Sequence, residues 1–143
     1  MVVSTKGRYA LRLMIDPAEH QGDSYLPLKE IAARQDISEK YLESIVKSLV
    51  QSNLLVGLRG KGGGYRLNRA PEQYTVGDIL RVTETSLSPV ACLEEGAAPC
   101  PRMMQCQTLP MWRKLDTLLN NFFDGITLAD LMASPEAWDN YVI

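Results

Sequence analysis

The chain has 143 residues, of which 45% are hydrophobic and 22% are charged, and its formal net charge is −2. This balance is typical of one folded domain, with or without an appended dimerisation element, and it excludes a disordered chain. No apolar run approaches the ~18 residues of a membrane span, and no signal-peptide pattern leads the sequence. We therefore expect a cytoplasmic protein with no membrane partner, whose three cysteines stay reduced unless they bind a metal.

The first predicted element is an amphipathic helix from Thr5 to about His20. Residues at helical spacing form its buried side, namely Tyr9, Ala10, Leu13 and Met14. The opposite side carries three basic residues, Lys6, Arg8 and Arg12. Because an interior proline removes a helix hydrogen bond, we expect a kink or an early end at Pro17. His20, the single histidine, is expected on the surface at the end of the helix.

Two further helices are predicted, over residues 28–37 and 38–50. Apolar residues at helical spacing mark one face of each, Leu28, Ile31 and Ala32 in the first and Leu42, Ile45, Val46, Leu49 and Val50 in the second. Ser38 is a candidate N-cap, with Glu39 in the first turn of the second helix. Because only a short turn separates the two helices, they must cross steeply, as in a helix-turn-helix. The second helix is then the natural reader of a DNA major groove.

A strand, a glycine-rich turn and a second strand are predicted next, over residues 54–58, 59–64 and 65–67. This hairpin would be the wing of a winged helix-turn-helix, so the fold class is mainly α-helical with a small β-hairpin. The glycines and lysine of the turn do not form a phosphate-binding P-loop. That motif opens a helix with Gly-Lys-Ser/Thr, whereas a strand follows here.

Charge is divided unevenly along the chain. Residues 1–69 carry 11 Lys/Arg and 7 Asp/Glu, net +4, whereas residues 70–143 carry 4 and 10, net −6. Four basic residues lie in and around the wing with no acid between them, Arg59, Lys61, Arg66 and Arg69. The asymmetry indicates a nucleic-acid-binding end on an otherwise acidic protein. It argues against the alternative of a winged helix that binds only protein.

The C-terminal half contains three more predicted helices. Thr75 caps a short one whose apolar residues can pack on the winged core, Val76, Ile79, Leu80 and Val82. From Gln107 a longer helix carries a broad apolar stripe of Trp112, Leu115, Leu118, Leu119, Phe122 and Phe123. This stripe can pack on its own domain or against the same helix of a second subunit, and we favour the dimer. A last capped helix is predicted over residues 127–132.

All three cysteines, Cys92, Cys100 and Cys106, lie in a loop punctuated by proline and glycine, with the spacing Cys-x7-Cys-x5-Cys. Soft thiolates that converge from one short loop suit iron–sulfur or zinc coordination. A disulfide switch between two of them is an alternative that leaves the third unexplained. The sequence therefore divides into a winged domain (1–84), a cysteine-containing sensor loop (85–106) and a dimerisation helix with a short C-terminal helix (107–143).

Several stretches together resemble the IscR/NsrR/CymR family of bacterial regulators. They are Thr5-Lys-Gly-Arg-Tyr-Ala10, Ser38-x-x-Tyr-Leu-Glu43, Arg59-Gly-Lys-Gly-Gly-Gly-Tyr65, Val76-Gly-Asp-Ile79, the three cysteines and Trp112. The resemblance implies a homodimeric transcription factor, not an enzyme, whose cysteine loop ligates an iron–sulfur cluster of the 2Fe–2S or 4Fe–4S type in several members. Those members sense cluster supply, nitric oxide or redox state, whereas others lack the cysteines.

The resemblance also assigns roles to residues of this chain. Cys92, Cys100 and Cys106 match the three thiolate ligands of the cluster. The residues that match DNA-contacting positions are Ser38, Lys40, Tyr41 and Glu43 in the reading helix and Arg59 and Lys61 in the wing. The fourth ligand departs from the family pattern, because Leu109 stands where the cluster-supply sensors have a histidine. Arg8 stands near another family ligand position, which leaves Asp16, Glu19, His20, Glu94 and Glu95 as candidates.

The resulting hypothesis is a cytoplasmic dimeric repressor that binds a pseudo-palindromic double-stranded DNA operator and responds to the state of its cysteine loop. A second hypothesis keeps DNA binding but replaces the cluster by thiol chemistry or zinc. A third, a small iron–sulfur electron carrier, explains neither the wing nor the charge division.

Overall fold

The computed structural model describes residues 3–20, 22 and 24–140. Its helices and strands are α1 (Thr5–Glu19), α2 (Leu28–Gln35), α3 (Glu39–Gln51), β1 (Leu55–Leu58), β2 (Gly64–Leu67), α4 (Val76–Thr83), α5 (Leu109–Asp124) and α6 (Leu128–Leu131). The fold is mainly helical with one two-stranded antiparallel sheet, which confirms the predicted winged helix-turn-helix. None of the helices in the described ranges has the length and hydrophobicity needed to span a bilayer.

The hydrophobic core lies where α1, α2 and α3 meet. Its fully buried apolar side chains include Ala10, Leu13, Met14, Ile31, Leu42, Ile45, Leu49 and Ile79. Leu128 of α6 belongs to the same core, although it follows Ile79 by almost fifty residues. Its backbone N–H donates to the carbonyl of Tyr74. The C-terminal segment therefore returns to the winged domain and completes its core, which local sequence patterns do not reveal.

The first helix runs past its proline. α1 ends at Glu19, two residues beyond Pro17, so the expectation of an early end is wrong. The backbone N–H of His20 still donates to the carbonyl of Asp16, at 3.0 Å. Pro17 lies buried in the last turn of α1, where it removes one helix hydrogen bond while its ring packs in the interior. His20 is exposed at the helix end, as predicted.

The turn between α2 and α3 is built by local chemistry. Asp36 adopts a left-handed conformation, with φ 53°, and ends α2. Ser38 then caps α3, because its hydroxyl accepts a hydrogen bond from the backbone N–H of Tyr41 at 3.1 Å. The N-cap predicted for the reading helix is thereby confirmed.

The wing is an antiparallel hairpin in which Leu55 pairs with Leu67 and Leu58 pairs with Gly64. Leu26, just before α2, exchanges two backbone hydrogen bonds of 2.8 Å with Tyr65 and so ties the hairpin to the helical core. Gly64 has φ 145°, and a Cβ atom there would overlap the carbonyl of Leu26. Glycine at this position therefore permits the close approach that fixes the base of the wing.

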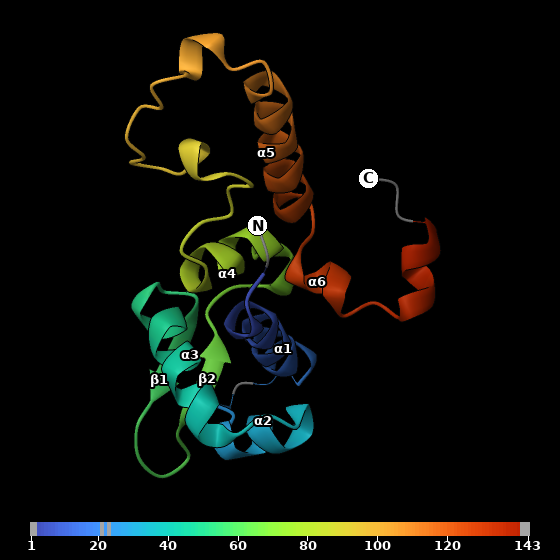
Figure 1. The fold of residues 1–143 in the computed structure, drawn as a ribbon. Coiled ribbons are helices and arrows are strands. Elements are labelled where there is room, and N and C mark those ends of the chain that lie inside the picture. The colour runs from blue at the N-terminus through green and yellow to red at the C-terminus, as the bar shows by residue number, and fades with distance from the viewer. Residues whose placement is uncertain (1–2, 21, 23, 141–143) are drawn as a thin grey trace.

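Helix α5 projects away from the winged core, and the loop that carries the cysteines arcs beside it (Figure 1). Its C-terminal end is anchored, because Phe122 and Phe123 pack against an apolar cluster that includes Val76 and Leu80 of α4. Toward its N-terminal end the apolar stripe is uncovered: Met111 is 53% exposed and Leu118 is 60% exposed. The stripe is thus only partly buried by the protein's own domain.

Candidate nucleic-acid interface and cysteine loop

The reading helix and the wing line one groove. This groove has a volume of about 340 Å³ and its lining includes Glu43, Val46, Lys47, Val50 and Gln51 of α3 and Gly57, Leu58, Arg59 and Tyr65 of the wing. Two of the residues singled out from the sequence, Glu43 and Arg59, are therefore brought together from segments sixteen residues apart. Both are exposed, so the groove presents charge from both elements to a ligand.

The other predicted DNA contacts lie around this groove. Lys40 and Lys61 are exposed, Lys40 in the first turn of α3 and Lys61 in the turn of the wing. The hydroxyl of Ser38 is engaged as the helix cap. Tyr41 is 39% exposed, and its ring packs edge-on against Tyr9 of α1 with 5.5 Å between the ring centroids. This contact orients Tyr41 and connects α1 to the reading helix.

Lys47 was not predicted as part of the site. It is exposed on α3 one turn after Glu43 and lines the same groove. The available signal was its i+4 spacing from Glu43, which places both side chains on one face of the helix. With two basic residues, Lys47 and Arg59, and a single carboxylate, the described lining of the groove has a net positive charge, as a phosphate backbone requires.

An ion pair between a buried carboxylate and a partly exposed arginine holds α2 in place on α1. Asp16 is 0% exposed, and its carboxylate accepts hydrogen bonds from Nε and Nη2 of Arg34, the shortest at 2.7 Å. The side-chain amide of Gln35 donates to the same carboxylate, and the guanidinium of Arg12 donates to the backbone carbonyl of Gln35. The hydrogen bond with Asp16 raises the pKa of Arg34 above its ordinary value. Asp16 is therefore occupied by Arg34 and is no longer a candidate metal ligand.

The three cysteines are free, half-buried thiols on the loop between α4 and α5. Cys92 lies in a 3-10 turn of residues 91–93, and Cys106 directly follows a second such turn of residues 103–105. Sγ of Cys106 lies 3.4 Å from the hydroxyl of Thr108, and this hydrogen bond lowers the pKa of the Cys106 thiol below its ordinary value. A lower pKa favours the thiolate, which is the form that binds metals.

The cysteines suit a cluster by their chemistry, since three thiols on one exposed loop form a soft donor set. Within the described ranges, however, no three or more His, Cys, Asp or Glu side chains are gathered where they could hold a metal ion. Leu109, at the position of the family's histidine, is 6% exposed and begins α5 as a buried apolar residue. Glu94 and Glu95 are exposed on the loop itself.

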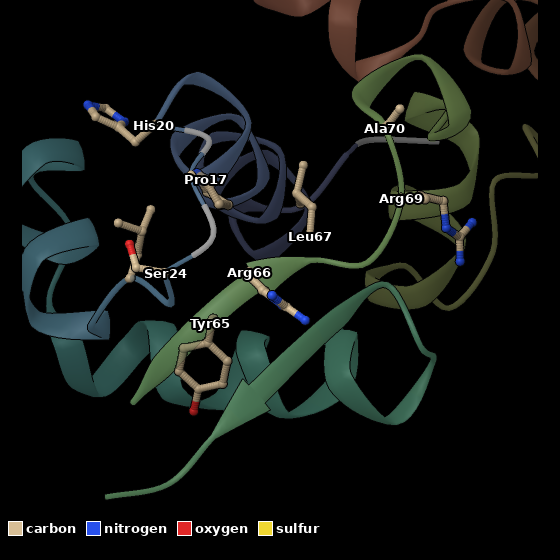
Figure 2. A pocket seen from close by; sticks show the side chains of 10 residues that line it. Pro17, His20, Ser24, Tyr65, Arg66, Leu67, Arg69 and Ala70 are labelled. Atoms are coloured by element: carbon tan, nitrogen blue, oxygen red, sulfur yellow. The ribbon is translucent and has the colours of Figure 1, made fainter. Parts of the chain in front are cut away.

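A second hollow of about 510 Å³ lies behind the wing, lined in part by Arg66, Arg69 and His20. Each arginine is stacked on an aromatic ring, Arg66 over Tyr25 at 4.7 Å and Arg69 over Tyr74 at 4.8 Å from the ring centroid. Figure 2 shows His20 and Arg69 at opposite ends of this hollow. Its polar side chains thus do not converge on one point, and the hollow lacks the arrangement of a small-ligand site.

The chain is similar to known bacterial regulators. A family model described as Rrf2, an iron-dependent transcriptional regulator, matches residues 3–134. The HTH-type transcriptional regulators IscR of Aliivibrio salmonicida and Sodalis glossinidius are each 37% identical to it, over 136 and 139 residues. These matches cover 95% and 97% of this chain and 80% and 83% of the relatives.

Solved structures show the same likeness. CymR of B. subtilis, described as its global cysteine regulator, has a TM-score of 0.74 at 37% identity, over 92% of this chain and 96% of CymR. IscR of T. potens has a TM-score of 0.72 at 34% identity, over 100% of this chain and 93% of that IscR.

The matches extend over both the winged region and the cysteine loop, and the relatives are transcriptional regulators, not enzymes. They agree with a groove formed by a reading helix and a basic wing. The chain is therefore a DNA-binding transcriptional regulator that belongs to the Rrf2 family.

Proposed function

We propose that this protein is a cytoplasmic dimeric repressor that binds a pseudo-palindromic operator and releases or retains it according to the state of its cysteine loop. The observation that carries the DNA-binding part is the groove in which Glu43 and Lys47 of α3 face Arg59 of the wing. In this proposal residues 1–84 bind DNA, residues 85–106 sense, and residues 107–143 dimerise, while Leu128 also completes the core of the first segment.

The residues of the groove would read DNA in different ways. α3 would lie in the major groove, where the carboxylate of Glu43 can accept a hydrogen bond from cytosine N4 and is repelled by phosphates elsewhere. Arg59 would enter the adjacent minor groove, where narrow A·T tracts concentrate negative potential. Lys40, Lys47 and Lys61 would contact phosphates and set the register of the protein on the duplex.

Dimerisation would follow from the uncovered stripe of α5. Met111 and Leu118 are more than half exposed, and Trp112, Leu115 and Leu119 are half-buried. An isologous pair of α5 helices would bury this face on both subunits at once. Such a dimer presents two copies of α3 to the two half-sites of a palindrome.

The sensing part rests on the donor set of the loop. Cys92, Cys100 and Cys106 would hold an iron–sulfur cluster, and the lowered pKa of the Cys106 thiol favours its thiolate form. When bound, the cluster supplies iron and sulfide that react with oxidants and nitric oxide. The protein's own residues anchor the loop, expose its middle to solvent at residues 94–99, and connect it to the winged core.

A cluster-free regulator that uses thiols or zinc is the second candidate. It is favoured by Leu109, because a buried leucine cannot supply the fourth ligand that the cluster-supply sensors take from histidine at this position. One of the related structures is of Staphylococcus aureus CymR in an oxidized form, at 32% identity. The two candidates share the DNA-binding surface and differ only in what happens at the cysteines.

The deciding experiment is an absorption spectrum of protein purified without oxygen, with iron and acid-labile sulfide assayed on the same sample. Visible charge-transfer bands with equal iron and sulfide, lost in a Cys100→Ala variant, would support the cluster. A colourless protein that binds operator DNA would favour the second candidate, a cluster-free regulator that uses thiols or zinc. Protein that shows no salt-dependent DNA binding in any form would contradict the proposed function as a whole.

A further inference from the structure

The carboxylate of Glu84 holds Ser4, the N-cap residue of α1. The backbone N–H and the hydroxyl of Ser4 both donate to Oε1 of Glu84, at 2.9 and 2.7 Å. The same hydroxyl accepts a hydrogen bond from the backbone N–H of Gly7, at 3.1 Å. A negative charge at this position is favourable, because the unpaired N–H groups and the dipole of a helix make its N-terminal end positive.

Gly7 makes room for this carboxylate. A Cβ atom on residue 7 would overlap Oε1 of Glu84 and would lie 3.2 Å from Cδ2 of Leu80. Glycine is unfavourable inside a helix, because it loses the most backbone freedom on folding. Gly7 is needed in α1 because only a residue without a side chain leaves space for the Glu84 carboxylate.

Glu84 is also the residue at which the cysteine loop begins. It follows the last residue of α4, its N–H donates to the carbonyl of Leu80 at 2.8 Å, and Cys92 lies eight residues further on. Leu87, three residues after Glu84, is buried in a cluster against which Val3 and Leu11 pack. The start of the loop therefore holds the start of α1 through both a polar and an apolar contact.

The other end of this connection is the reading helix. Tyr9, two residues after Gly7, packs edge-on against Tyr41 of α3, with an angle of 82° between the rings. Tyr41 lies near the N-terminal end of α3, the end that a helix-turn-helix directs at base edges. A continuous set of contacts thus runs from the loop through Glu84 and α1 to Tyr41.

We propose that Glu84 is the positioning residue that transmits the state of the cysteine loop to the reading helix. The inference rests on the proposed sensing function. A rearrangement of the loop that draws Glu84 away from Ser4 removes the acceptor that holds this N-cap residue, and the first turn of α1 shifts. Because α1 is one rigid helix, Tyr9 moves with it and changes the position of Tyr41. The loop thereby biases α3 between two arrangements with different operator affinity.

The test compares operator affinity between states of the loop in Glu84→Gln and in the matched control Glu72→Gln. Glu72 is an exposed acid outside these contacts, so its replacement removes the same charge. Affinity is measured by fluorescence anisotropy for three forms of each protein: free thiols, cysteines alkylated with N-ethylmaleimide, and cluster-loaded. The last form is not needed for the outcome, since alkylation perturbs the loop by itself.

The expected result is a loss of coupling without a loss of DNA binding. Coupled sites typically change affinity by about 5- to 150-fold, and in Glu84→Gln this ratio should fall to within about twofold of one. Glu72→Gln should keep the wild-type ratio. Hydrogen exchange should be faster at the Gly7 amide in Glu84→Gln, because the cap is weakened.

Three outcomes would overturn the inference, and they are distinguishable. A Glu84→Gln variant that weakens binding equally in every form, and so keeps the wild-type ratio, would make Glu84 a structural contact only. A Glu84→Gln variant that keeps both the wild-type ratio and the wild-type affinities would exclude Glu84 from the connection while the sensing function stands. A wild-type ratio of one would overturn the sensing function and the inference with it. If Glu84→Gln fails to fold, Gly7→Ala, which displaces the carboxylate but keeps it, must also reduce the ratio.

Discussion

Replacing Arg59 by alanine tests how the wing binds DNA. Arg59 directly follows β1, is exposed, and lies in no ion pair with any described residue, so its charge is available to a phosphate or a minor groove. Each phosphate neutralised on B-DNA contributes about 0.9 to the slope of log K against log salt. A dimer carries two copies of Arg59, and we therefore expect the slope to become shallower by about 1.8 in Arg59→Ala.

This change in slope has a measurable consequence. When salt rises from about 50 to about 200 mM, the affinity of the variant should fall about 12-fold less than that of the wild-type protein. The assay is fluorescence anisotropy with an operator duplex over a series of salt concentrations. Arg113→Ala is the matched control, because Arg113 is an exposed arginine on α5 outside the apolar stripe. An Arg59→Ala variant with the wild-type slope would refute the assignment of Arg59 to the DNA interface.

Three further predictions concern other parts of the molecule. Glu43→Ala should lose about 1–3 kcal/mol of discrimination at one base pair, measured by competition with singly substituted operators, and an unaltered preference would contradict its reading role. Leu118→Glu should produce monomers in sedimentation experiments because it places a charge in the proposed interface, whereas Thr117→Glu, outside the stripe, should not. Cys106, whose pKa is lowered by Thr108, should be alkylated before Cys92 at about pH 7, as followed by mass spectrometry, and the reverse order would be inconsistent with this contact.

The helices of this fold could be predicted because their ends are encoded locally. Ser38, Thr75 and Thr127 were each expected to begin a helix, and in each case the side-chain oxygen accepts a hydrogen bond from the backbone N–H three residues later. A cap, an apolar period and a glycine-rich turn are read within about ten residues, so they need no knowledge of the rest of the chain.

Contacts between distant segments could not be predicted in this way. Leu128 is fully buried in the core of the winged domain, yet nothing in residues 127–132 indicates which surface that helix covers. At Pro17 the local rule that proline ends a helix failed, because α1 continues to Glu19 with the proline buried. Lys47 shares a helix face with Glu43, but the groove that it lines forms only where the wing lies beside α3. Tertiary packing decides all three.

For the cysteine loop, the sequence predicts which residues act together but not how they are arranged. The spacing of Cys92, Cys100 and Cys106 predicts a donor set, but it does not fix where each thiol lies in the folded loop. Residues 94–99 are all exposed and bury nothing in the core, so little packing energy opposes their rearrangement. The DNA-reading end is the reverse: the buried Asp16 carboxylate fixes α2 on α1, and breaking such a pair is costly.

In the proposed mechanism, a signal would not reach the DNA-reading helix through the exposed middle of the loop. It would enter where the loop joins the packed core, and Glu84 and Leu87 lie at one such junction. From there α1 reaches α3, with Ser4 at one end and Tyr9 against Tyr41, and α4, which ends at Glu84, also packs on α3. A loop that rearranges easily can affect a firmly packed DNA-reading helix only through an element that contacts both. Helix α1 is placed to make this connection.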